Sequence, residues 1–323
     1  MCTAITYQTK DHYFGRNLDY ECGFGEKVTI TPRDFVFPFR RLAPIEHHYA
    51  MIGMAVVASE YPLYFDATNE YGLSMAGLNF PRSAKYFPET PEKNNVTPFE
   101  LIPWLLCTCK TVEEAQQKLA DTNIVNIPFS KDFPLSPLHW IIADKTSCAI
   151  VEQTAEGLRI YNNSVGVLTN EPPFPFHIMN LQNYLNVTAE EVTNRFAPNV
   201  ELQACSRGMG GFGLPGDLSS PSRFVKAAFT KLNSVSKDSE SASISQVFHI
   251  LGSVAQQQGC VKIGTFYEKT LYTSCCNTDK GIYYYTTYEN SQITGVRLHG
   301  VDLDAEKLYT YPLVTGQQIR LEN

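Results

Sequence analysis

The sequence lacks several features that would assign the protein to a large functional class. No apolar run approaches the roughly 18 residues that a membrane-spanning helix needs, and no basic start is followed by an apolar stretch. We therefore expect no membrane contact and a cytoplasmic location. Basic runs are also missing, and 26 lysines and arginines stand against 33 aspartates and glutamates, which gives a formal charge of −7. This balance argues against nucleic acid as a partner.

Cysteine spacing and internal repeats give no functional signature either. The nine cysteines form an odd set without the two-residue gap of common zinc sites, and no histidine lies close enough to complete one. We interpret them as reduced thiols and predict neither a metal nor another cofactor. The 323 residues contain no repeat, low-complexity tract or linker, so we expect residues 1–323 to form a single domain.

A glycine-rich run at residues 208–213 matches the glycine spacing of a dinucleotide-binding loop. That site requires a helix beginning at the glycines, and Pro215 and Gly216 would interrupt such a helix. We therefore interpret the run as a flexible loop leading to a helix, in which Ser220 is the cap and Pro221 the first helical residue. Arg223 then lies in the first turn of this helix; the alternative is a solvated surface arginine.

The first seven residues, Met1 to Tyr7, place a thiol one residue from the start of a predicted strand. If Met1 is removed, Cys2 carries both a thiol and a free amine, and these groups titrate within about one pH unit of each other. The amine can accept the thiol proton and later deliver it to a leaving group, as in enzymes with an N-terminal nucleophile. The alternative, which position alone favours, is that Cys2 is a small apolar residue in a buried strand.

Residues 13–20 predict a second strand that returns beside the first and carries Arg16 and Asp19 toward Cys2. Arg16 would favour the thiolate, and Asp19 would accept a hydrogen bond from the α-ammonium. Residues three apart in a strand point to opposite faces, so the two side chains share a face only if a bulge or strand end redirects one. A surface ion pair is the alternative.

Two asparagines lie at strand ends, Asn79 near the end of the predicted strand 73–80 and Asn170 directly after the strand 165–169. From such a position a carboxamide or a backbone N–H can point into a cleft, although an ordinary turn residue is the alternative for Asn79. The segment 124–138 is punctuated by prolines and has unusual apolar bulk for a loop. It is either a substrate wall or a segment packed against the core.

Five motifs together resemble the choloylglycine hydrolases, a family of N-terminal-nucleophile amidases that includes bile salt hydrolases and penicillin V acylases. They are Met1-Cys2-Thr3, Gly15-Arg16-Asn17-Leu18-Asp19, Ala76-Gly77-Leu78-Asn79-Phe80, Val167-Leu168-Thr169-Asn170, and Gly213-Leu214-Pro215-Gly216-Asp217 followed by Ser222-Arg223-Phe224. The resemblance runs from Met1 to about Tyr311. It favours bile salt hydrolases within the family, because penicillin V acylases tend to carry Tyr where Asn79 stands.

The resemblance implies an α+β fold of four layers (αββα), with two antiparallel sheets between helix layers, in agreement with strands predicted at both ends of the chain and helices between them. It implies hydrolysis of the amide bond between a cholic-type steroid acid and glycine or taurine. The resemblance also implies a catalytic centre made of Cys2 as nucleophile with its own amine as base, Arg16 and Asp19 as its assistants, Asn79 and Asn170 as the oxyanion site, and Arg223 as support.

For the steroid we expect an apolar wall made of Leu18, Phe65, Phe129, Phe133 and Leu138. We also expect a homo-oligomer, with a tetramer as the candidate, although the sequence does not determine the number of subunits. Two alternatives stay open. One is a penicillin V acylase or another acylase of fatty amides; the other is a catalytically silent protein that binds steroids or lipids and needs no free N-terminal cysteine.

Overall fold

The computed structural model describes residues 1–323, most of whose regular structure is β-strand. One group of strands comprises β1 (Cys2–Gln8), β2 (His12–Tyr20), β12 (Val167–Leu168), β13 (Val261–Ile263), β14 (Phe266–Asn277), β15 (Ile282–Thr287) and β16 (Asn290–Arg297). A second comprises β3 (Lys27–Thr31), β4 (Met51–Ala58), β5 (Tyr61–Asn69), β6 (Ser74–Asn79), β9 (Leu138–Ala143), β10 (Cys148–Thr154), β11 (Gly157–Asn162) and β17 (Tyr309–Pro312). The short strands β7 (Asn94–Val96) and β8 (Thr122–Ile124) form a parallel pair of their own.

These groups form two antiparallel sheets. The first sheet has seven strands in the order β12-β1-β2-β14-β15-β16, with β13 paired to β14. The second has eight strands in the order β11-β10-β9-β6-β5-β4-β3-β17. Because β14 comes from the C-terminal part of the chain and pairs with β2, the two ends of the sequence meet in the first sheet.

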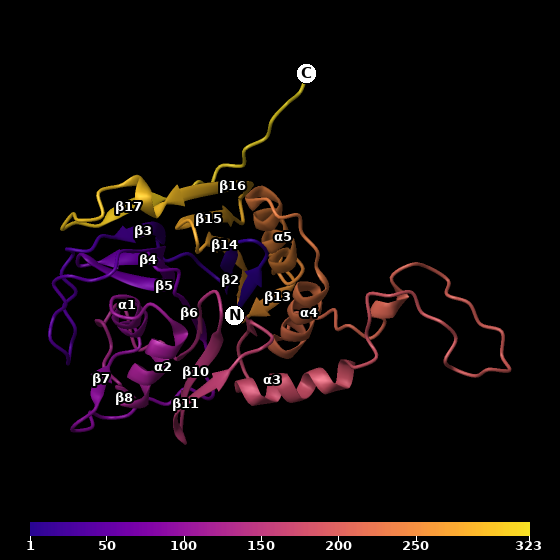
Figure 1. The fold of residues 1–323 in the computed structure, drawn as a ribbon, viewed down its shortest axis with the longest axis horizontal. Helices are drawn as coiled ribbons and strands as arrows, with labels where there is room; N and C mark the ends of the chain where they lie inside the picture. Colours follow the sequence, from indigo (N-terminus) through magenta and orange to yellow (C-terminus); the bar gives the residue numbers. More distant parts are fainter.

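Helices lie on the outer side of both sheets (Figure 1). They are α1 (Leu101–Leu106), α2 (Val112–Ala120), α3 (Phe174–Leu181), α4 (Ser220–Asn233) and α5 (Glu240–Gly252), with the 3-10 turns η1 (Gln182–Tyr184), η2 (Met209–Gly211) and η3 (Leu298–Gly300). Helix α1 contacts β5 and β6, whereas α4 and α5 contact β1, and α3 packs on α4. The predicted α+β fold, with two antiparallel sheets between helix layers, is confirmed.

The core between the sheets surrounds β1. Ala4 and Ile5 of β1 belong to one cluster of buried apolar residues with Ile52 and Leu78 of the second sheet. A second cluster joins the outer face of the second sheet to the helices α1 and α2. Strand β1 lies between β12 and β2, so its backbone is paired on both edges and its first residue, Cys2, is held by the sheet.

The start of α4 differs from the prediction by one residue. Ser219 occupies the N-cap position, Ser220 is the first helical residue and Pro221 follows it in the first turn. This shift matters because it frees the Ser220 hydroxyl from capping. The glycine-rich run before α4 forms the short turn η2 and a loop, in agreement with the loop interpretation.

Residues 188–210, which we call the arm, project from the body of the molecule (Figure 1). The Thr188 N–H donates to the Gly210 carbonyl oxygen at 2.9 Å and closes the base of the arm. Gly210 is needed there because a Cβ atom would lie 2.4 Å from the Thr188 carbonyl oxygen. Within the arm the hydrogen bonds are local, as from the Asn194 side chain to the Ala197 and Val200 carbonyl oxygens.

The structure also bears on membrane crossing, on the state of the cysteines and on metal binding. No helix of the structure has both the length and the apolar character that a bilayer crossing demands. All nine cysteines are free thiols, of which Cys22, Cys205 and Cys260 are exposed. No three side chains of His, Cys, Asp or Glu converge closely enough to hold a metal ion.

Candidate active site

The register of β1 and β2 brings Arg16 and Asp19 to Cys2 from opposite faces of the first sheet. Cys2 pairs with Leu18, and Ala4 pairs with Arg16, so these side chains share one face. That face is turned toward the second sheet, because Arg16 bonds to carbonyl groups of β5 and β6. Asp19 points to the other face, toward α4. The pairing of β2 with β1 is regular, and the bulge opposite Asp19 lies in the neighbouring strand β14, between Thr270 and Tyr272. Both side chains therefore reach the neighbourhood of Cys2 without sharing a face.

Arg16 lies where β5 and β6 separate. Pairing between these strands ends at Asp66 and Ala76, and Phe65 is an extra residue of β5 at a bulge opposite β4. Nη1 of Arg16 donates to the carbonyl oxygens of Phe65 and Gly77, both at 2.9 Å. The guanidinium therefore satisfies two carbonyl groups that the sheet leaves over. Bulges next to binding sites commonly redirect a side chain, and Phe65 lines the cavity described below.

A buried carboxylate that sequence reasoning missed lies behind Arg16. Asp66 accepts hydrogen bonds from the hydroxyl groups of Tyr272 at 2.8 Å and Tyr283 at 2.7 Å. Burial raises the pKa of Asp66, and the attraction of Arg16 offsets only part of this. A lone acidic residue in an otherwise apolar strand was the signal for it, since carboxylates are seldom fully buried without a partner.

The charge on Arg16 is maintained beside the thiol. Burial tends to lower the pKa of Arg16, but its electrostatic interactions with Cys2 and Asp66 raise it, and the net pKa lies above the ordinary value. Nη2 of Arg16 is buried without a hydrogen-bond partner in the chain. Arg16 is therefore cationic, and it retains an unused donor. It is 0% exposed, as is Asp19, so the alternative of a surface ion pair is wrong.

The backbone nitrogen of Cys2 donates to Oδ1 of Asn170 at 2.8 Å. Met1 precedes it in this chain, and the Met1 ammonium donates to the main-chain oxygen of Asp19 at 2.6 Å and pairs with the Glu268 carboxylate. Removal of Met1 would create the α-amine at the Cys2 nitrogen, with Asn170 already in place as its acceptor.

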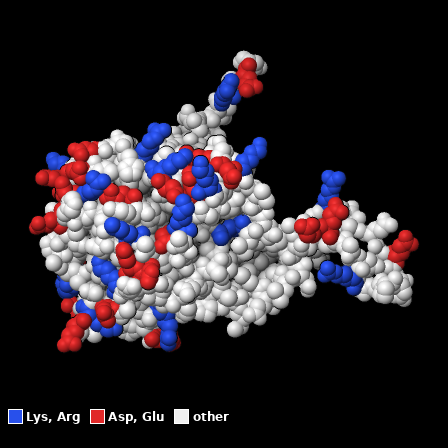
Figure 2. All heavy atoms as spheres, viewed as in Figure 1, with Lys and Arg blue, Asp and Glu red and all other residues white.

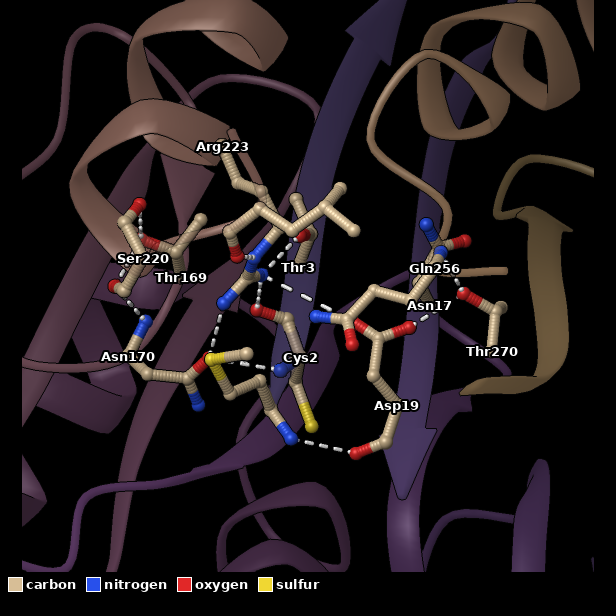
Figure 3. Close-up of polar contacts among 12 residues, drawn as sticks. Cys2, Thr3, Asn17, Asp19, Thr169, Asn170, Ser220, Arg223, Gln256 and Thr270 are labelled. Atoms are coloured by element: carbon tan, nitrogen blue, oxygen red, sulfur yellow. Dashed lines mark hydrogen bonds and ion pairs between the residues drawn. The ribbon is translucent and has the colours of Figure 1, made fainter. Parts of the chain in front are cut away.

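Arg223 occupies the centre of the polar network (Figure 3). Its Nη1 donates to the Cys2 carbonyl oxygen and, at 2.7 Å, to Oγ1 of Thr3. Its Nη2 donates to Oδ1 of Asn170 at 2.7 Å. Burial lowers the pKa of Arg223, and the nearby carboxylate of Asp19 opposes this shift more strongly than any other group. Arg223 is 1% exposed, so the alternative of a solvated surface arginine is wrong.

Asp19 is a buried carboxylate on the helix side of the sheet. Thr270 Oγ1 donates to its Oδ1 at 2.6 Å, and its Oδ2 lies 3.9 Å from Nη1 of Arg223. Burial raises the pKa of Asp19, and Arg223 and the N-terminal ammonium offset only part of that. In this chain the main-chain oxygen of Asp19 accepts from the Met1 ammonium while its carboxylate holds Thr270. The contact expected between Asp19 and the α-ammonium of Cys2 concerns the chain without Met1 and stays a prediction.

Asn170 ties Cys2 to the end of β6. While its Oδ1 accepts from Cys2, its Nδ2 donates to the Asn79 carbonyl oxygen at 2.7 Å. Its own backbone is held at both ends: the N–H donates to Ser220 Oγ at 2.8 Å, and the carbonyl oxygen accepts from His177 Nε2 at 2.9 Å. Asn170 thus holds the Cys2 nitrogen through Oδ1 and Asn79 through one N–H of Nδ2, and the second N–H of Nδ2 stays available as a donor.

Asn79 is better placed to offer a donor through its backbone. The N–H of the next residue, Phe80, donates to the Pro137 carbonyl oxygen at 2.7 Å, next to β9. Successive N–H groups of a strand point to opposite edges, so the Asn79 N–H points away from β9, to the edge that β5 has left. Asn79 and Cys2 line one cavity.

Cys2 opens into an apolar cavity of about 390 Å³. The five residues predicted for a steroid wall all line it: Leu18, Phe65, Phe129, Phe133 and Leu138. The rings of Phe129 and Phe133 pack edge to face with centroids 6.0 Å apart, and Phe129 also packs against Phe99. The segment 124–138 is thus a cavity wall that is itself packed against the protein. Cys2 is 4% exposed, as a buried strand residue would be, yet it faces this cavity.

A second, polar cavity of about 1220 Å³ meets the same centre. Met1, Asn79 and Asn170 line it together with residues from the start of α4 and from the loop before β13. Asn79 lines both cavities, Cys2 lines the apolar one and Met1 lines the polar one, so the two cavities meet beside Cys2.

This arrangement has counterparts among known proteins. The sequence model of the linear amide C–N hydrolases of the choloylglycine hydrolase family matches residues 2–311. The chain belongs to the choloylglycine hydrolase family. Two relatives within this family are the bile salt hydrolase/transferase of Lactiplantibacillus plantarum, 54% identical over 98% of each chain, and that of Clostridium perfringens, 39% identical over 96% of each.

Solved structures of choloylglycine hydrolases share the fold. A mutant of the conjugated bile acid hydrolase from Clostridium perfringens matches with a TM-score of 0.93 at 36% identity, covering 100% of both chains. The penicillin V acylase from Agrobacterium tumefaciens matches with a TM-score of 0.76 at 19% identity, covering 97% of this chain and 92% of its own, which shows the fold alone. The predicted family and the predicted enzyme class, a linear amide C–N hydrolase, are confirmed.

Proposed function

We propose that this choloylglycine hydrolase cleaves the amide bond of glycine- or taurine-conjugated bile salts. The observation that carries the proposal is that the apolar and polar cavities meet at Asn79, beside the Cys2 thiol, which lines the apolar cavity. A conjugated bile salt has the same division, since a rigid apolar steroid and a small acidic amine meet at one amide. The names of the relatives from Lactiplantibacillus plantarum and Clostridium perfringens support this substrate class.

In the proposed mechanism, Met1 is removed and the amine of Cys2 accepts the thiol proton. The thiolate attacks the amide carbon, and the negative charge that develops on the carbonyl oxygen is met by the Asn79 N–H. A preorganised donor of this kind lowers the barrier by about 2.7–4 kcal/mol. The ammonium then protonates the leaving nitrogen, the C–N bond breaks, and glycine or taurine departs. The acyl group remains on Cys2 as a thioester until water, deprotonated by the amine, releases it.

Each neighbouring residue has a proposed part in these steps. Arg16 stabilises the thiolate, because it is a buried cation on the thiol side of the sheet. Asn170 holds the amine through Oδ1, and we propose that it contributes to the oxyanion site by holding the Asn79 backbone through Nδ2. Arg223 and Asp19 hold the start of β1 in place from the helix side.

The test is a panel of glycocholate, taurocholate and penicillin V, assayed with the wild type and with Cys2→Ser, after intact mass has established the loss of Met1. We expect hydrolysis of both bile salts by the wild type, weaker hydrolysis of penicillin V, and little hydrolysis by the serine variant. Hydrolysis of penicillin V alone would establish the acylase alternative. Retained Met1 with steroid binding and no hydrolysis would establish the silent binder.

A second activity, transfer of the acyl group to an amine, is favoured by the word transferase in the relatives' names and by the large polar cavity. The thioester that water resolves can also be resolved by an amine that enters where the first one left. Incubation of glycocholate with excess taurine should then yield taurocholate in addition to cholate. Cholate as the sole product would exclude the transfer.

We further propose that the protein is a homo-oligomer, with a tetramer as the candidate. The arm exposes Phe196 (86%), while Leu185 at the end of η1 (82%) and Met179 of α3 (68%) are exposed on the body. Figure 2 shows the surface over α3 nearly free of charged side chains. A second copy would cover these groups. Light scattering should give a multiple of 36.3 kDa for the wild type and a smaller mass for Phe196→Asp; a monomeric wild type would refute the proposal.

We also propose that residues 1–323 fold as one domain. A single apolar cluster joins β1 and β2 with β14, β15 and the second sheet, so neither sheet has a core of its own on the inner side. A single cooperative transition in calorimetry is expected, and two separate transitions would contradict this.

A further inference from the structure

The polar cavity has more cationic side chains than its walls neutralise. Arg82, Lys226 and Lys262 line it, and none of the three side chains makes an ion pair or a hydrogen bond within the chain. Lys226 is half-buried on α4, and the other two are exposed. The chain as a whole has a formal charge of −7, so unpaired cations at one cavity make this region more positive than the chain as a whole.

Two carboxylates line the same cavity, and both are committed to loop contacts. Glu171 accepts hydrogen bonds from the N–H groups of Arg82 and Ser83 and from the Ser83 hydroxyl. Asp217 accepts from the N–H of Ser219 and the hydroxyl of Ser222, and hydrogen bonds from these serines lower the pKa of Asp217 to about 2. Among the side chains of the lining, three cations stand against two anions, an excess of one positive charge.

The start of α4 adds to this preference. Ser219, Ser220 and Pro221 line the cavity, and α4 is 14 residues long. The N-terminal end of a helix has a partial positive charge that attracts anions. The helix end and the three side chains thus act in the same direction.

We propose that the polar cavity is the subsite for the amine half of the substrate, and that Lys226 and Lys262, with Arg82, recognise its acidic group. This inference rests on the proposed function. Asn79 lines both cavities, so an amide with its acyl part in the apolar cavity sends whatever follows the nitrogen into the polar one. In glycine and taurine this group is a carboxylate or a sulfonate on one or two carbon atoms.

The type of cation sets the selectivity that follows. A lysine is a flexible point charge without the fixed fork of an arginine, so it follows a carboxylate or a sulfonate at slightly different distances. The subsite should therefore separate acidic from neutral amines more strongly than it separates glycine from taurine. For the transfer reaction, the same subsite would select acidic amines as acceptors.

A matched pair of substrates tests the inference: glycocholate and the glycinamide conjugate of cholate, which differ in a carboxylate against a neutral carboxamide. The variants are Lys226→Gln, Lys262→Gln and the double variant. The control is Lys10→Gln, an exposed lysine beyond the far end of β1, a strand whose six steps from Cys2 to Gln8 span about 20 Å at about 3.3 Å each.

We expect the wild type to prefer glycocholate in kcat/KM, and each variant to reduce the ratio of the two substrates by about 2- to 5-fold, the range for a solvent-exposed charge pair. The effect should lie in KM and shrink with added salt, since exposed charges are screened. Lys10→Gln should leave the ratio unchanged.

Three outcomes would overturn the inference. A wild type that treats both substrates alike would do so, as would variants that weaken both in parallel or leave the ratio unmoved. In these cases hydrolysis itself persists and the proposed function stands. A wild type that hydrolyses neither cholate conjugate would overturn the proposed function and this inference together.

Discussion

Replacing Asn170 by alanine tests how the amine of Cys2 is held. The side chain accepts hydrogen bonds from the Cys2 nitrogen at 2.8 Å and from Arg223 at 2.7 Å, and it donates to Asn79 at 2.7 Å. After removal of Met1 the Cys2 nitrogen becomes a charged donor during the reaction, and a hydrogen bond to a charged group contributes about 1.5–3 kcal/mol. If that stabilisation is lost mainly in the transition state, kcat falls by about 10- to 150-fold.

The assay is steady-state hydrolysis of glycocholate, with kcat and KM determined separately. Asn163→Ala is the matched control, because Asn163 is exposed to the same extent as Asn170, 4% in each case, and also holds the backbone around β12. Its side chain bonds to Val167 and Gly166 and does not touch Cys2. We expect it to lower the free energy of unfolding and to leave kcat of the folded enzyme near the wild-type value.

Two results would refute this reasoning. A raised KM with unchanged kcat would mark Asn170 as a residue that binds substrate in its ground state. An equal fall of kcat in both alanine variants would mean that the loss reflects general loosening of β12. Ser220→Ala gives a graded check, because it removes the acceptor of the Asn170 N–H and should reduce kcat less than Asn170→Ala does.

Four further predictions concern the nucleophile, the apolar cavity and the effect of pH. Cys2→Ser should fold and lose most activity, because a hydroxyl has a far higher pKa than a thiol and the amine is too weak a base for it; near wild-type hydrolysis by trimmed protein would rule out Cys2 as nucleophile. Iodoacetamide should modify the exposed thiols of Cys22, Cys205 and Cys260 before the buried thiol of Cys2. A variant with serine at those three positions should therefore be inactivated by a single adduct on Cys2. Peptide mapping that finds the inactivating adduct on another cysteine would contradict this. Phe133→Ala should lower kcat/KM for glycocholate and taurocholate together, by about tenfold for a contact of about 1.5 kcal/mol, whereas a large change in their ratio would place this segment at the amine end. Burial lowers the pKa of His12 to about 4, below its unfolded value of about 6.5. The contribution of His12 to the free energy of unfolding should therefore be complete above pH 6.5 and fall by up to about 3 kcal/mol as the pH drops toward 4. Urea unfolding of His12→Gln should show a smaller slope of the free energy of unfolding against pH in this window, and an unchanged slope would exclude His12 as its source.

The sequence by itself determined the parts of the site that are local. The hairpin of β1 and β2 could be predicted because a short turn joins two runs of alternating residues, and such a turn sets the pairing of Cys2 with Leu18. The apolar segment 124–138 could be predicted as a wall from its composition. The family, the αββα architecture and the enzyme class followed from the five motifs, whereas the roles of individual residues, the single domain and the cytoplasmic location stay predictions.

Only the tertiary structure decided how the distant residues combine. Asn79, Asn170 and Arg223 come from three elements, and their contacts depend on the order of strands in two sheets, which local sequence does not encode. The engagement of Nδ2 of Asn170 by Asn79, the support of Arg16 by Asp66 and two tyrosines, and the contact between Ser220 and Asn170 all join residues at least 50 positions apart.

The polar cavity is the clearest case of residues that only the tertiary structure brings together. Arg82, Lys226 and Lys262 are ordinary surface cations in the sequence, with nothing in their neighbours to connect them. They line one cavity because the segment after β6, the first half of α4 and β13 meet beside Met1. Where strands end is a consequence of packing across the whole core, so the charge of this cavity follows from the fold and not from any one segment.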